Sequence, residues 1–184
     1  MESKPELRMR YRQLRDGALE HDRMLWSDLV CRHLAGLCRS RGLLRVGAFW
    51  PLGSEVDLRP LVASEPHLTF FFPRIHGVEP PCLRWGGQPL EPGAWGLLEP
   101  QHAPHPQPPV QLLLVPGLAF AGDGHRLGYG KGFYDTVLAA LPEDVLTLGV
   151  GFRFQRCPEL PISPRDRPVR GLVDEAGIQW LNPA

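Results

Sequence analysis

Three alternating glycines, Gly128, Gly130 and Gly132, constrain this chain more than any other feature of its sequence. They follow an apolar run at residues 112–115 by way of a Pro-Gly pair. Glycine lets backbone N–H groups approach an anion with no Cβ in the way. A helix that begins after the glycines would direct its positive end at the same point. The run therefore predicts a phosphate-binding loop between a buried strand and a helix.

A plain glycine-rich turn is the alternative interpretation of this run. The Walker pattern fails because Gly132, and not Ser or Thr, follows Lys131, and the G-x-G-x-x-G spacing of dinucleotide sites is also absent. A turn needs one or two glycines, whereas here three surround a lysine. Ligands of open α/β sheets bind beyond the carboxyl ends of the strands, which is where this run lies. We therefore favour the functional interpretation.

The totals of the chain predict one cytoplasmic domain. Its 184 residues suit a single domain with a full core, which we expect to span residues 1–184. No apolar run approaches the roughly 20 residues of a membrane helix, so we expect no membrane partner. The N-terminus is charged and has no secretory signal pattern. The four cysteines form no C-x-x-C pair, and we expect reduced thiols.

Hydrophobic periodicity and turn residues predict alternating helices and strands, and therefore an α/β layered fold. The inward face of the second helix is expected to carry Leu25, Leu29, His33 or Leu34, and Leu37. Pro73 is expected to end the second strand. Residues 99–109 are rich in proline and predict a surface connection. The expected helices begin at the Ser3-x-x-Glu6 capping box and span residues 22–41, 57–64 and 131–141. The expected strands span residues 45–50, 68–72, 82–85, 111–115, 145–151, 169–173 and 178–181.

Four basic residues of the first helix, Lys4, Arg8, Arg12 and Arg15, recur at helical spacing and share one face. A solvated helix face is the simplest interpretation, and the alternatives are contacts with nucleotide phosphates or with nucleic acid. The chain carries 20 Lys and Arg against 20 Asp and Glu, a net charge of zero. This balance, and the lack of a recognisable nucleic-acid module, argue against nucleic acid.

Several acids and tryptophans stand where a ligand site would need them. Asp135 could hold Mg²⁺ beside bound phosphates. Alternatively, its negative charge could only interact favourably with the positive end of the helix dipole. Taken individually, Asp166 and Glu55 are most simply interpreted as acids in surface loops. Glu55, however, follows the carboxyl end of a strand, where ligands of α/β sheets bind. Trp50 and Trp95 could wall a flat heteroaromatic ligand, or they could belong to the core.

Taken together, these segments resemble the 5-formyltetrahydrofolate cyclo-ligase family over nearly the whole chain. The most specific match runs from Leu114 to Asp135 and contains the glycine run. The other matching segments are Lys4-x-x-Leu7-Arg8, Phe49-Trp50-Pro51, Gly53 to Asp57, Phe72-Pro73-Arg74, Gly96 to Pro100, and Leu160 to Asp166 with Val169.

The resemblance implies an enzyme that uses ATP and Mg²⁺ to cyclise 5-formyltetrahydrofolate to 5,10-methenyltetrahydrofolate, releasing ADP and phosphate. The γ-phosphoryl group would pass to the formyl oxygen, and N10 of the folate would then attack. The implied fold is a three-layer α/β/α sandwich around a mostly parallel sheet, similar to sugar-phosphate isomerases and CoA transferases. We expect a monomer whose partner is a small-molecule substrate.

The resemblance also implies roles for individual residues. Lys131 and Arg126 are implied to be catalytic, and Asp135 and Asp166 to hold the metal ion. The implied folate contacts are Trp50, Glu55, Tyr129 and Phe133. The implied nucleotide contacts are Lys4, Arg8, Arg126, Leu127, Gly128, Tyr129, Gly130, Lys131, Gly132, Phe133 and Tyr134.

Three other functions compete with this one. A sugar-phosphate or CoA-ester enzyme of the same fold needs a catalytic acid motif that does not appear here. A non-catalytic nucleotide- or folate-binding relative is disfavoured because Lys131, Asp135 and Asp166 are all present. A nucleic-acid binder that uses its basic helix is the third alternative, and its binding would depend steeply on salt.

Overall fold

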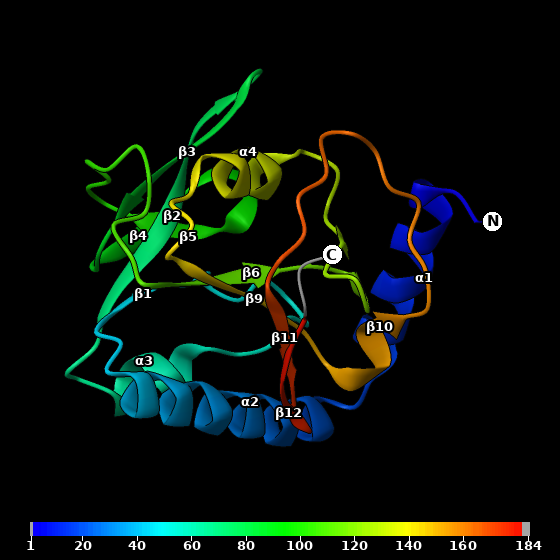
Figure 1. Cartoon of the computed structure of the whole chain (residues 1–184), viewed down its shortest axis with the longest axis horizontal. Coiled ribbons are helices and arrows are strands. Elements are labelled where there is room, and N and C mark those ends of the chain that lie inside the picture. The colour runs from blue at the N-terminus through cyan, green and yellow to red at the C-terminus, as the bar shows by residue number, and fades with distance from the viewer. Residues whose placement is uncertain (1, 182–184) are drawn as a thin grey trace.

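A seven-stranded sheet forms the centre of the molecule in the computed structural model, which describes residues 2–181 (Figure 1). Residues 1 and 182–184 of the expected domain lie outside the described part. The strand order is β12-β11-β9-β6-β1-β2-β3. Neighbours from β2 to β11 pair in parallel, whereas β3 and β12 pair antiparallel at the edges, so the predicted mostly parallel sheet is confirmed. The strands are β1 (Arg45–Gly47), β2 (Thr69–Val78), β3 (Pro81–Gly86), β6 (Leu112–Pro116), β9 (Leu146–Val150), β11 (Gly171–Asp174) and β12 (Gly177–Trp180).

Two smaller sheets flank the large one. A three-stranded sheet consists of β7 (Ala119–Ala121), β8 (Arg126–Leu127) and β10 (Arg156–Cys157). A two-stranded ribbon consists of β4 (Leu90–Pro92) and β5 (Leu98–Pro100). The β7–β8 hairpin was not predicted, and it separates the glycine run from the central strand β6.

The helices are α1 (Lys4–Gly17), α2 (Glu20–Arg41), α3 (Arg59–Ser64) and α4 (Phe133–Ala140), with two short 3₁₀ turns at Ala94–Gly96 and Arg153–Gln155. The backbone N–H of Ser3 donates to the Glu6 carboxylate over 2.8 Å at the start of α1, as the predicted capping box requires. α4 begins two residues later than predicted, because Gly132 has φ +73° and cannot continue a right-handed helix. Within residues 2–181, no helix is long and apolar enough to cross a membrane.

Helices cover both faces of the large sheet. α2 and α3 lie against one face and α4 against the other (Figure 1). β6 is buried on both faces: Leu112 and Leu114 belong to the core beneath α2, while Leu113 and Val115 belong to the core beneath α4. This burial explains why the strand reads as a continuous apolar run. The α/β layered prediction is confirmed, and the specific likeness to sugar-phosphate isomerases remains a prediction.

β2 does not end at Pro73, as the sequence analysis expected, but continues to Val78. Residues of β2 up to Phe71 pair with β1, and β1 then ends. The Pro73 nitrogen points toward that vacated side, where a backbone N–H would have no strand carbonyl as its acceptor. On its other side, Pro73 stands opposite Trp85, whose backbone bonds to His105 instead of β2. Proline is therefore tolerated where the strand has become an edge.

The buried face of α2 agrees only in part with the expected one, because Leu34 and Leu37 are buried as predicted but the other two leucines are not. Leu25 and Leu29 are exposed, whereas Val30, Leu34 and Cys38 are buried. All four cysteines are free, which confirms the expected thiols. Burial raises the pKa of both Cys31 and Cys38 to about 11, so these two thiols stay protonated at neutral pH.

Truncation of Leu114 tests whether β6 is the centre of the core. Leu114 is fully buried, and Leu114→Ala should lower the free energy of unfolding by about 2–5 kcal/mol because it leaves a cavity. The matched control Leu44→Ala removes an exposed leucine and should change stability by less than about 0.5 kcal/mol. Urea unfolding followed by circular dichroism measures both. Equal effects of the two variants would contradict the assigned core.

Candidate functional site

The glycine loop, residues 128–132, lies at the surface between β8 and α4. Tyr129, Gly130, Lys131 and Gly132 are all exposed, so the loop is open as predicted. Gly130 has φ +94° and Gly132 has φ +73°, conformations that other residues adopt only with strain. The loop therefore leaves its main chain accessible to a ligand.

The basic face of α1 packs against this loop. Arg8 Nε donates to the Gly128 carbonyl over 2.9 Å, and the Arg8 guanidinium carbon lies 3.3 Å from where a Cβ on Gly130 would stand. Lys4 Nζ lies 2.5 Å from Asp166 Oδ2, in the loop that follows β10. The structure thus brings Lys4 and Arg8 to the glycine run, as predicted, although they are far from it in the sequence.

The two candidate metal ligands, Asp135 and Asp166, are both held by cations. Asp135 Oδ1 accepts from Arg126 Nη2 over 3.0 Å and from the Arg167 backbone N–H over 3.1 Å. Asp166 Oδ2 accepts from Lys4 and from the Ser163 backbone N–H. Burial works to raise the pKa of Asp166, but hydrogen bonds from Lys4 and Ser163 outweigh it, and this pKa is lowered.

These carboxylates fit Mg²⁺ only in company with a phosphate ligand. Among residues 2–181, no group of three or more His, Cys, Asp or Glu residues is placed to hold a metal ion by itself. Mg²⁺ in proteins is commonly bound by one or two carboxylates, several waters and substrate phosphate oxygens. The donor set therefore suits a metal ion that arrives with a nucleotide.

Arg126 is a buried cation at the base of the loop. Its side chain is 4% exposed, and its Nη1 donates to the Arg167 carbonyl over 2.7 Å. Burial lowers the pKa of this guanidinium, while Asp135 and Asp166 act in the opposite direction. Arg126 thus ties β8 both to α4, which carries Asp135, and to the loop after β10, which carries Asp166.

Glu55 is a buried carboxylate, and not the surface loop acid that the alternative interpretation proposed. Its side chain is 8% exposed, and it accepts hydrogen bonds from the Tyr129 hydroxyl and from the Leu52 backbone N–H. Arg15 Nη1 lies 2.9 Å from Tyr129 Oη and 3.9 Å from Glu55 Oε1. Burial raises the pKa of Glu55, although these partners oppose the shift. The glycine loop and the loop after β1 therefore meet at this carboxylate.

The aromatic residues divide between the loop and the core. Lys131 Nζ lies 5.6 Å from the ring centroid of Trp95, and the rings of Trp95 and Phe133 are 6.2 Å apart. Trp50 is half-buried and packs edge-on against Phe72 at 5.8 Å. Of the two tryptophans considered from the sequence, Trp95 is thus the one beside the glycine loop, and Trp50 sits at the end of β1.

Tyr134, the second residue of α4, has a buried hydroxyl with no hydrogen-bond partner among the described residues. Burial raises the pKa of this hydroxyl above its usual range, so it remains a donor at neutral pH. The indole Nε1 of Trp85 is also buried and unpartnered, and the two rings lie 6.5 Å apart. Unpaired buried donors are costly, and a bound ligand is one way to satisfy them.

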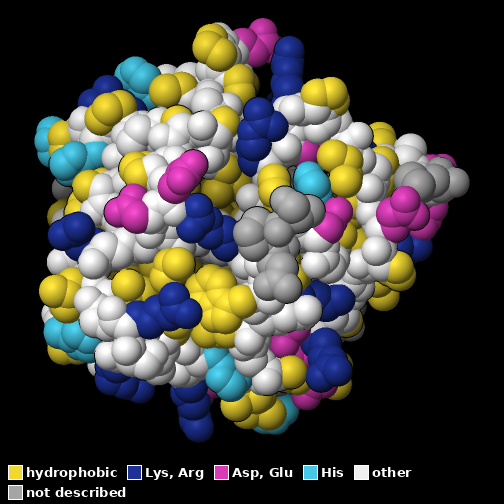
Figure 2. Space-filling view, in the orientation of Figure 1, with side chains coloured by type: hydrophobic (Ala, Val, Ile, Leu, Met, Phe, Trp, Pro, Cys, Tyr) yellow, Lys and Arg dark blue, Asp and Glu magenta, His cyan; other side chains and the backbone are white. Residues whose placement is uncertain are grey.

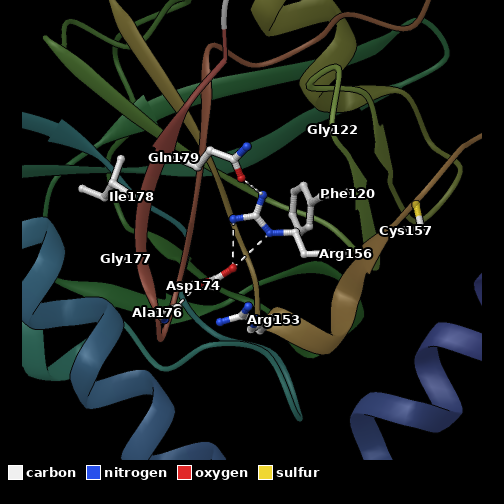
Figure 3. A pocket seen from close by; sticks show the side chains of 10 residues that line it. All are labelled: Phe120, Gly122, Arg153, Arg156, Cys157, Asp174, Ala176, Gly177, Ile178 and Gln179. Carbon is white, nitrogen blue, oxygen red and sulfur yellow. Dashed lines mark hydrogen bonds and ion pairs between the residues drawn. The ribbon is translucent and has the colours of Figure 1, made fainter.

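A separate hollow of about 520 Å³ lies beyond β9 and β11 (Figure 3). Arg156 crosses it, with its Nε 3.0 Å from Asp174 Oδ2 and its Nη1 3.3 Å from Gln179 Oε1. No glycine-loop residue lines this hollow, and its central charge is already paired. We therefore place the candidate site at the glycine loop, where open backbone and the unpartnered Tyr134 hydroxyl occur together.

Arg15 is the site residue whose part the sequence analysis missed. It was grouped with the other cations of α1 as a solvated or phosphate-binding residue, yet it is 5% exposed and reaches Tyr129. The sequence feature that could have indicated this role is the spacing of Arg15 from Lys4 and Arg8, because it places all three residues on one helix face.

The fold and this site define an α/β protein with a mostly parallel sheet and an exposed glycine loop beside the basic face of α1. Comparison with known families gives the particular assignment. The model of the 5-formyltetrahydrofolate cyclo-ligase family matches residues 1–175, and the chain belongs to that family.

Individual relatives agree with the assignment. The solved structure of 5,10-methenyltetrahydrofolate synthetase from Aquifex aeolicus is 34% identical, covers 97% of this chain and 92% of its own, and superposes with a TM-score of 0.83. A 5-formyltetrahydrofolate cyclo-ligase from Mus musculus is 39% identical over 70 residues, which span 36% of this chain and 34% of the mouse protein. One from Haemophilus influenzae is 21% identical over 182 residues, or 94% and 97% of the two chains.

A methyl group at Gly130 tests the geometry of the loop. Gly130→Ala places a Cβ at φ +94° and within 3.3–3.6 Å of the Arg8 guanidinium, so it should destabilise the fold by about 1–3 kcal/mol. The control Gly122→Ala adds a methyl group in open space and should leave stability unchanged or raise it by about 0.4–1 kcal/mol. Thermal unfolding compares the two. A Gly130→Ala protein as stable as the control would show that the loop adopts another shape.

Proposed function

We propose that the protein catalyses the ATP- and Mg²⁺-dependent cyclisation of 5-formyltetrahydrofolate to 5,10-methenyltetrahydrofolate, with release of ADP and phosphate. The observation that carries this proposal is the junction of two unlike subsites at Tyr129. On one side lies an open glycine loop with cations beside it. On the other side lies a buried carboxylate, Glu55, that accepts a hydrogen bond from the Tyr129 hydroxyl. A reaction between a nucleotide and a folate needs such a junction.

The nucleotide side consists of the glycine loop and the cations around it. The backbone N–H groups of Gly128, Gly130 and Gly132 would bind the triphosphate, together with Lys131, Lys4 and Arg8. Arg126 would hold the transferring phosphoryl group from beneath the loop. Asp135 and Asp166 would hold Mg²⁺, which supplies charge neutralisation on the phosphate oxygens when bound.

The folate side lies around Glu55. A buried carboxylate offers two acceptor oxygens, which suit the adjacent N–H donors of a pterin ring. Trp50, Tyr129 and Phe133 would line the ring, and the unpartnered Tyr134 hydroxyl offers one further donor. These contacts would place the formyl group at the glycine loop.

The chemistry suits this arrangement. A formamide carbon is a poor electrophile because its nitrogen donates into the carbonyl, and its oxygen is a poor leaving group. Transfer of the γ-phosphoryl group onto that oxygen removes both difficulties. N10 then attacks the activated carbon, loses its proton, and phosphate departs as the ring closes. Such a reaction depends on positioning and charge neutralisation, which the loop and its cations can supply.

A nucleic-acid function has less support. Lys4, Arg8 and Arg15, which would form the basic face, are each engaged by other parts of the chain. In Figure 2, basic and acidic side chains are interspersed over the visible face instead of forming one basic patch. The cytoplasmic location and the monomeric state remain predictions.

Direct assay tests the proposed activity. The full chain, incubated with 5-formyltetrahydrofolate, MgCl₂ and ATP, should produce the absorbance of 5,10-methenyltetrahydrofolate. Omission of ATP or chelation of Mg²⁺ should abolish the signal. A folded protein that forms no product in the complete mixture would refute the proposal.

Lys131 provides a sharper test of the phosphoryl-transfer assignment. Lys131→Ala should lower kcat/KM at least tenfold, or about 1.4 kcal/mol of transition-state stabilisation, because it removes the loop's only ammonium. The control Arg32→Ala removes an exposed cation of α2 that pairs only with Asp28, and it should keep the wild-type rate. Wild-type kinetics for Lys131→Ala would exclude this residue from the reaction path.

A further inference from the structure

Arg15 is a buried cation that joins three segments of the chain. It lies on α1 and is 5% exposed. Its Nε lies 3.0 Å from Ser54 Oγ, in the loop after β1, and its Nη1 lies 2.9 Å from Tyr129 Oη, in the glycine loop. Glu55 supplies the balancing negative charge at 3.9 Å. Burial of an unpaired guanidinium would be costly, so these partners hold one another in place.

The same helix face carries the phosphate-side cations. Near the N-terminus of α1, Lys4 contacts Asp166 and Arg8 contacts Gly128. Near its C-terminus, Arg15 contacts Tyr129 and Glu55. The rise from Lys4 to Arg15 is roughly 16 Å in a helix. One rigid element of 14 residues thus spans both proposed subsites.

α1 packs through a small core of its own. Leu7 and Tyr11 are buried with Leu118, Leu127 and other residues of the sheet that contains β7, β8 and β10. This cluster is distinct from the two cores that fill the faces of the large sheet. The position of α1 therefore depends on this cluster and on the contacts of its basic face, and not on the main core.

We propose that Arg15 is a positioning residue that couples nucleotide binding to folate binding through α1. The inference rests on the proposed function. Phosphate oxygens that bind Lys4 and Arg8 where they already lie beside the loop would hold α1 in this position, and α1 would in turn hold Arg15 against Tyr129 and Glu55. Binding of one ligand then pre-orders the site of the other, which is a reciprocal coupling of their affinities.

Folate titrations with and without a non-hydrolysable ATP analogue and Mg²⁺ test the coupling. For the wild type, the analogue should tighten 5-formyltetrahydrofolate binding by about fivefold or more. Arg15→Gln removes the charge and should reduce this factor below about twofold. The analogue alone should still bind this variant, because Lys4 and Arg8 are intact. Arg15→Lys should restore part of the factor, because an ammonium can still pair with Glu55.

Two further variants keep the test decisive if Arg15→Gln does not fold. Tyr129→Phe removes only the hydroxyl that accepts a hydrogen bond from Arg15 and donates one to Glu55, and it should also reduce the coupling. Arg10→Gln changes an exposed cation of α1 that pairs with Glu2, and it should leave the coupling unchanged.

The outcomes separate this inference from the proposed function. Wild-type protein that binds neither ligand would refute the proposed function itself. Wild-type protein that binds both ligands without coupling would overturn only the role of Arg15. If the ATP analogue tightened folate binding by the wild-type factor in both Arg15→Gln and Tyr129→Phe, that result would also overturn the role of Arg15.

Discussion

The contact between Arg8 and the glycine loop is the interaction on which the rest of the site depends. The Arg8 guanidinium donates to the Gly128 carbonyl and rests against the main chain at Gly130, where a Cβ would stand 3.3 Å from the guanidinium carbon. This contact docks α1 beside the loop and leaves the loop's outer side exposed. It also sets the position of Lys4 at one end of the helix and of Arg15 at the other. A glycine at position 130 thus leaves room for a cation from the N-terminal helix to pack against a loop more than 100 residues away.

The sequence predicted the parts of the fold that local chemistry dictates. The apolar run of β6 identified a strand buried on both faces, and the Ser3–Glu6 pair identified the start of α1. It failed where tertiary context decides. Pro73 was expected to end β2, but a proline is harmless once the neighbouring strand has stopped. The inward face of α2 was predicted correctly at Leu34 and Leu37 but wrongly at Leu25 and Leu29, because apolar residues occur on more than one side of that helix and only contact with the sheet selects one.

The candidate site shows the same division. The alternating glycines predicted an exposed loop, and the family resemblance implied that Lys4 and Arg8 act beside it. Periodicity cannot tell that Arg15 is buried while Arg12, on the same face, is exposed, because burial depends on where Ser54 and Tyr129 fall in space. The buried environment of Glu55 could not be predicted from the sequence either. Its main partner lies 74 residues along the chain, and no local pattern records that pairing.

The most direct test of the account is the location of nucleotide binding in the folded chain. Addition of a non-hydrolysable ATP analogue with Mg²⁺ to isotopically labelled protein should shift the backbone amide resonances of the glycine loop and of the first turns of α1. The amides around the Arg156 hollow should remain unchanged and serve as an internal reference. Shifts confined to that hollow, or the absence of shifts in residues 128–132 at saturating analogue, would contradict the claim that the open glycine loop is the phosphate site.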